Sequence, residues 1–160
     1  MPIEMQIVMD FCEFLTVLHG KPTLAHFGDR ILRKEIEDEI AANGIARWLV
    51  PEKNDKGDEL ANATENTVQT FRGDLVIIAD KASDCVKENL ALLRLVYLSA
   101  EGIVGKNAAP VEWDGTGQAI GKMDVYRFEP VGDEIVLAAR EWDGKFVIEQ
   151  PVIISAEKIP

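Results

Sequence analysis

The stretch from Trp113 to Gly121, WDGTGQAIG, has the glycine content of a loop that binds a nucleotide. A dinucleotide-binding loop leads from a strand into a helix, whose N-terminus receives the pyrophosphate. Here the next residues, 122–128, have the pattern of a strand, and the glycine spacing is one residue too long for the fingerprint. No Lys-Ser or Lys-Thr pair follows, as a P-loop would require. We therefore expect a flexible turn that starts at Asp114-Gly115, and no bound cofactor.

Side chains that bind metals or act as nucleophiles are sparse. His19 and His26 are the only histidines, and with Cys12 they do not give a known zinc spacing or an obvious fourth ligand. None of the three serines lies in a G-x-S-x-G motif, and Ser83 is explained as a helix cap. We predict no catalytic, cofactor-binding or metal-binding residues, and we expect that the chain is not an enzyme.

Carboxylates crowd one predicted helix, at Glu35, Glu37, Asp38 and Glu39. Acid/base catalysis requires a desolvated carboxyl group with a shifted pKa, whereas these groups have the pattern of a solvated face. Two alternatives stay open for this face, namely an acidic cluster that binds a metal and a surface that binds a basic protein.

Composition sets the class of protein. A chain of 160 residues, 47% of them hydrophobic, predicts a single domain over residues 1–160 with one sizeable core. The 28 acidic and 17 basic residues give a net charge of −11, which repels nucleic acids and anionic membranes and permits a basic protein partner. Cys12 and Cys85 lie in apolar segments and are expected to be buried, reduced thiols, which favours the cytoplasm. The N-terminus lacks the charge pattern of a secretory signal, and no apolar run approaches the roughly 20 residues of a membrane span.

Hydrophobic periodicity predicts three helices and five strands. Helices are expected at about 2–19, 24–43 (ending at Asn43-Gly44) and from Asp80 or Ser83 to Gly102, and strands at about 45–50, 67–79, 119–128, 133–142 and 145–154. Asp143-Gly144 predicts a two-residue hairpin turn, because both turn positions need positive φ. Pro151 predicts that the last strand is at an edge or is interrupted there. Residues 51–66 predict a long polar loop.

These elements predict an α+β fold, a mainly antiparallel sheet with helices packed on one face, in the order ααββαβββ. A ferredoxin-like βαββαβ arrangement is the alternative, and it requires residues 14–18 to be a strand rather than a helix. Side chains that are candidates for contact with a partner are the tryptophans outside the glycine stretch and the acids of the polar loop: Trp48, Asp55, Asp58, Glu59 and Trp142. Core packing is the simpler interpretation of the tryptophans.

From Ile45 onward, the strand, the polar loop, the long strand VQTFRGDLVIIAD, the helix SDCVKENLALLRLVYL and the closing strands resemble the bacteriophage tail terminator or tail-completion family. The resemblance covers the layout of residues 26–154 and assigns no functional residue. It implies a ring-forming, non-enzymatic structural protein of the virion, which sits at the end of the tail tube and joins it to the capsid connector.

Two functions follow as expectations. The first is an assembly protein that contacts itself and other protein subunits, through the loop at 51–66 and one sheet edge. The alternative is an acidic inhibitor or immunity-type protein that binds a basic protein partner through the carboxylates between Glu35 and Glu39 and those of the loop. Neither involves a cofactor, a nucleic acid or a membrane.

Overall fold

The computed structural model describes residues 8–13, 15–16, 21–27, 30–52, 69–98, 111–112 and 122–159. Residues 8–13 and 15–16 are helical and form the N-terminal helix. The elements that follow are β1 (Leu24–Ala25), α2 (Arg33–Asn43), β2 (Ala46–Pro51), β3 (Gln69–Ala79), α4 (Ala82–Leu98), β4 (Val111–Glu112), β5 (Lys122–Pro130), the short 3-10 turn η1 (Val131–Asp133), β6 (Arg140–Trp142) and β7 (Lys145–Ile159). Helices and one sheet thus form the predicted α+β fold.

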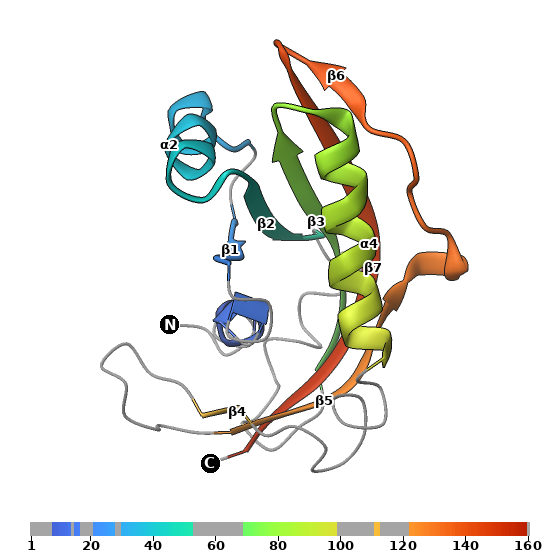
Figure 1. Ribbon diagram of the computed structural model, residues 1–160. Coiled ribbons are helices and arrows are strands. Elements are labelled where there is room, and N and C mark those ends of the chain that lie inside the picture. Colours follow the sequence, from blue (N-terminus) through green and yellow to red (C-terminus); the bar gives the residue numbers. More distant parts are fainter. Residues whose placement is uncertain are drawn as a thin grey trace.

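The sheet is built around two long neighbouring strands, β3 and β7 (Figure 1). Its strand order is β1-β2-β3-β7-β5-β4, and β6 pairs with β7 beside this path. The pairing is antiparallel throughout, except that β1 runs parallel to β2, with Leu24 opposite Trp48. The mainly antiparallel sheet is therefore as predicted.

Helices cover both faces of the sheet, which corrects the prediction that they share one face. Leu75 and Ile77 of β3 belong to a core that also contains residues of α4 and of the N-terminal helix. Ile78, on the opposite face of the same strand, packs in a second core with Ile36 of α2. The reason is that β3 is apolar on both faces, and each face must be removed from water.

The second helix is shorter than its sequence pattern suggested. Residues 24–43 were expected to be helical, but Leu24 and Ala25 pair with β2, and the N–H of His26 donates to the Leu49 carbonyl at 3.0 Å. The helix begins only at Arg33, because the residues around β1 bond to the edge of β2 instead of to a helix of their own. Its end at Asn43 is confirmed, because Gly44 takes a left-handed conformation with φ of 77°.

The ferredoxin-like alternative is wrong, because Leu15 and Thr16 are helical where it requires a strand. The predicted hairpin is confirmed: Trp142 pairs with Lys145, and the intervening Asp143 and Gly144 have φ of 50° and 80°. The expected polar loop and glycine stretch lie outside the described residues, apart from Pro51, the last residue of β2, and Glu52, which follows it.

The predicted strand at 133–142 is wrong over most of its length, because only residues 140–142 are extended in the sheet. Residues 134–136 are instead held by one buried side chain, that of Gln150 in β7. Its Oε1 accepts from the Val136 N–H at 2.8 Å, and its Nε2 donates to the Glu134 carbonyl at 2.9 Å. Asn89 of α4 also donates to Gln150 Oε1 and to the Val136 carbonyl, each at 3.1 Å. Side-chain bonds therefore replace a backbone ladder at this point.

Pro151 lies next to this interruption rather than at an edge of the sheet. It pairs with Asp74 of β3 on one side of β7. On the other side, the register with β5 ends at Val152 and that with β6 begins at Val147. The sheet is thus open on one side of Pro151, which tolerates a residue without an N–H.

Candidate functional site

A cleft of about 790 Å³ lies between the N-terminal helix, the segment around β1 and α2. The N-terminal helix contributes Met9, Cys12, Glu13 and Thr16, the β1 segment contributes residues 22–27, α2 contributes Glu35, Asp38 and Glu39, and β2 contributes Trp48. This volume is in the range of ordinary ligand-binding pockets.

Two kinds of side chain share this cleft. Met9, Leu24 and Phe27 are large apolar residues that remain 42%, 38% and 42% exposed. Four carboxylates line the same cleft, namely Glu13, Glu35, Asp38 and Glu39, and no Lys or Arg is among its described lining residues. The cleft therefore presents apolar surface under a negative charge.

Helical geometry places the carboxylates of α2 on the side of the cleft. Glu35, Asp38 and Glu39 are three and four residues apart and therefore share one face. The Glu35 Oε2 accepts from the Leu32 N–H at 3.1 Å, and the Glu39 Oε2 accepts from the Asn43 Nδ2 at 3.0 Å. Glu37, which was predicted as part of the same acidic face, does not line the cleft. It pairs with the Arg33 guanidinium at 2.8 Å.

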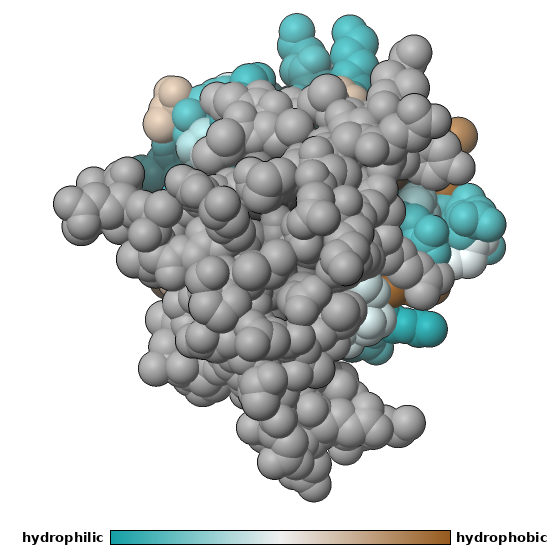
Figure 2. All heavy atoms as spheres, turned by 90° about the horizontal axis from the view of Figure 1, so that it is seen from below, coloured by the Kyte–Doolittle hydropathy of each residue, from teal (hydrophilic) through white to brown (hydrophobic). Residues whose placement is uncertain are grey.

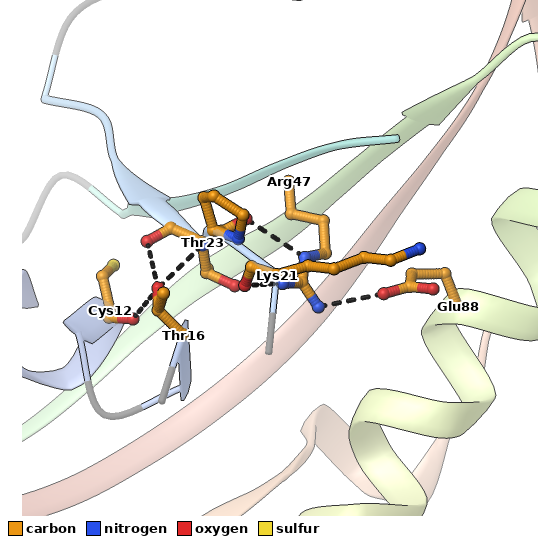
Figure 3. A network of polar contacts seen from close by, with 7 residues as sticks. Cys12, Thr16, Lys21, Thr23, Arg47 and Glu88 are labelled. Carbon is orange, nitrogen blue, oxygen red and sulfur yellow. Dashed lines mark hydrogen bonds and ion pairs between the residues drawn. The ribbon is translucent and has the colours of Figure 1, made fainter. Parts of the chain in front are cut away.

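Arg47 of β2 is buried and holds in place the segment before β1, which forms one wall of the cleft (Figure 3). Its guanidinium donates to the carbonyl oxygens of Lys21 and of Pro22, the latter at 3.2 Å, and its Nη1 pairs with the Glu88 Oε1 of α4 at 2.9 Å. Burial lowers the pKa of Arg47, and the Glu88 carboxylate acts against this effect. Arg47 thus links three elements from within the core.

Thr16 links the N-terminal helix to the same wall (Figure 3). Its hydroxyl donates to the Cys12 carbonyl at 2.8 Å and accepts from the Thr23 N–H at 2.9 Å. The segment that lines the cleft is therefore bonded on both sides, to the N-terminal helix and to β2.

A second surface feature lies over α4. Leu90, Ile135 and Leu137 are 39%, 44% and 64% exposed, and we call them the outer apolar patch. Asn89 bonds to the carbonyl of Val136, which brings the segment of Ile135 and Leu137 to the helix of Leu90. Val136 points inward and packs against the first core. In the view of Figure 2, which shows one face of the molecule, most described side chains at the margin are hydrophilic, with few hydrophobic ones between them.

The predicted partner contacts have different outcomes. Trp48 is 3% exposed and packs in the second core, which corrects its assignment as a surface contact, because β2 is covered by α2 on that side. Trp142 is 36% exposed on the β6–β7 hairpin, so its role stays a prediction. The acids of the polar loop lie outside the described residues, namely Asp55, Asp58 and Glu59.

The residues considered for other chemistry are also placed. Cys12 and Cys85 are free, buried thiols, as predicted. Burial raises the pKa of Cys12 far above its usual range, and it raises that of Cys85 to about 11. His26 lines the cleft, and His19 lies outside the described residues.

Over the described ranges, no group of three or more His, Cys, Asp or Glu side chains is arranged to hold a metal ion. No helix of the described part is long and apolar enough to cross a membrane.

Sequence patterns did not reveal the cleft or the outer apolar patch. The sequence predicts a helix around Leu24 and Phe27 and a strand around Ile135 and Leu137, so it does not assign the exposed sides of these residues. The one available signal was the apolar character of Leu24 and Phe27 immediately after the turn at Pro22.

Comparison with models of known protein families gives no match, and no curated protein matches the sequence significantly. The function must therefore be argued from the surfaces described above.

Proposed function

We propose that the protein is a non-enzymatic assembly subunit that contacts copies of itself and other protein subunits. The observation that carries this proposal is the outer apolar patch. Single exposed apolar side chains are common, but three large ones on adjoining segments favour a protein contact. Leu137 contributes most, since it is 64% exposed while its neighbour Val136 packs inward.

In this proposal the subunit has the role that its resemblance to phage tail terminators implies, a ring-forming component of a virion. The β6–β7 hairpin carries the exposed Trp142, which stays a second predicted contact. The polar loop at 51–66 stays a predicted contact arm.

The proposal is tested by light scattering on the purified protein across a concentration series. We expect a mass above that of the 17.7-kDa monomer at high concentration, and we expect Leu137→Asp to abolish the increase. Ala138→Asp is the matched control, because it adds the same charge at an exposed neighbour without removing a large apolar side chain. Equal self-association of wild type and Leu137→Asp would exclude the patch as the contact.

A second function, an acidic inhibitor or immunity-type protein that binds a basic partner, is favoured by the carboxylates that line the cleft. The response to added salt distinguishes the two proposed functions. A chain of net charge −11 repels its own copies, so added salt strengthens self-association, whereas it weakens binding to a cation. Opposite salt responses of the two processes are therefore expected.

A further inference from the structure

The cleft combines two features that are each unfavourable in the free protein. Met9, Leu24 and Phe27 leave much of their apolar surface in water. Glu35, Asp38 and Glu39 of α2 bring three negative charges to the same cleft, where like charges repel one another. An occupant that carried apolar groups and positive charges would relieve both.

No lysine or arginine is among the described residues that line the cleft. Arg33 and Lys34 begin α2, and Arg33 pairs with Glu37 and Asp143. A positively charged occupant would therefore bring to the cleft a charge that its described lining lacks.

We propose that the cleft binds a short, basic, amphipathic segment of a different protein. Apolar side chains of this segment pack against Met9, Leu24 and Phe27, while its lysine or arginine side chains lie against the carboxylates of Asp38 and Glu39. The aliphatic parts of lysine and arginine also pack well on apolar surface, so such residues match both features of the cleft. The proposal rests on the second proposed function and identifies its docking surface and its partner class.

Charge complementarity selects this occupant over other macromolecules. A nucleic acid or an anionic membrane would bring negative charge to a cleft lined by four carboxylates. A second copy of this chain, with its net charge of −11, is also disfavoured in this acidic cleft, whereas self-association is proposed at the outer apolar patch, through apolar side chains. A basic protein segment is attracted from a distance, and its rate of association should fall as salt is added.

The test measures the affinity of a fluorescein-labelled amphipathic peptide composed of leucine and lysine, by fluorescence anisotropy at low and at moderate salt. A peptide with glutamate in place of lysine is the control for the probe. We expect the lysine peptide to bind the wild-type protein, with an affinity that falls as salt increases, and the glutamate peptide not to bind.

Two charge variants locate the binding site. Asp38→Asn combined with Glu39→Gln removes two charges from the cleft, and we expect it to weaken binding roughly three- to tenfold at low salt. Glu134→Gln combined with Glu141→Gln is the matched control, since it changes the net charge equally at exposed positions outside the cleft. The control is expected to weaken binding by about twofold at most.

An apolar pair of variants tests the other half of the proposal. Phe27→Ala is expected to weaken binding about tenfold, whereas Leu137→Ala, at an exposed apolar position outside the cleft, is expected to leave it unchanged. Circular dichroism checks that each variant is folded. Folding is expected in both cases, because both side chains are more than one-third exposed.

The outcomes separate the docking site from the wider function. If the peptide binds and both charge pairs weaken it equally, the cleft is not the site, although binding of a basic partner stands. The same conclusion follows if Phe27→Ala has no more effect than Leu137→Ala. If the wild-type protein does not bind the peptide even at low salt, both the site and the second proposed function are overturned.

Discussion

Replacing either member of the buried Arg47–Glu88 pair tests the contact that fixes the wall of the cleft. The Arg47 side chain is 0% exposed and that of Glu88 is 13% exposed, with 2.9 Å between Nη1 and Oε1. Removing one partner of a buried ion pair costs about 3–5 kcal/mol of unfolding free energy, because the remaining polar groups stay desolvated. We expect Arg47→Met to lower the unfolding free energy by this amount, because it removes the ion pair with Glu88 and also the donors to the carbonyls of Lys21 and Pro22.

Glu88→Gln is expected to cost less, about 1–3 kcal/mol, since glutamine keeps an oxygen that accepts from Arg47 and the position is partly hydrated. In the double variant the two losses should not add, because the ion-pair energy can be lost only once. Urea denaturation followed by far-UV circular dichroism measures all four proteins. Additive losses within about 0.5 kcal/mol would refute the inference that the two side chains act as a pair.

Four further results are expected, each measured on purified variants or on the wild-type protein. Leu32→Ser should raise the unfolding free energy by about 1 kcal/mol in urea denaturation, because it adds a capping hydroxyl at an exposed N-cap, and no gain would argue against the cap geometry. Gly73→Ala should lower the melting temperature, because a Cβ would lie 2.8 Å from the Val50 carbonyl oxygen, and unchanged melting would contradict this close approach. Asp74→Asn should stabilise the fold at pH 7, because burial, followed by the charges of two neighbouring glutamates, raises the pKa of Asp74 above its value in the unfolded chain. This gain should disappear below about pH 4, where Asp74 is protonated in both the folded and the unfolded wild-type protein, and a gain independent of pH would contradict the raised pKa. Both cysteines should resist a thiol reagent at neutral pH until the protein is unfolded, and rapid labelling of the native protein would show that they are accessible.

Local signals predicted the features that depend on one or two residues. The hairpin at Asp143-Gly144 and the helix end at Gly44 both follow from positive φ, which few residue types adopt easily. Helix α4 and strand β3 could be predicted because their apolar residues recur in long, regular patterns. These parts could be predicted because their causes lie next to each other in the sequence.

Features that depend on distant contacts could not be predicted in this way. A single glutamine in a strand pattern does not indicate that Gln150 holds residues 134–136, fifteen positions or so earlier in the chain, through its amide. An arginine in β2 likewise does not reveal that Arg47 is buried against Glu88. The cleft arises from the same cause, because it forms only where the N-terminal helix, β1 and α2 meet.

Assembly through the outer apolar patch can be tested by hydrogen–deuterium exchange at low and high protein concentration. We expect amides in residues 134–142 to become protected as the concentration rises, and we expect Leu137→Asp to prevent this change. Exchange that is independent of concentration, or protection that arises only elsewhere in the chain, would contradict it.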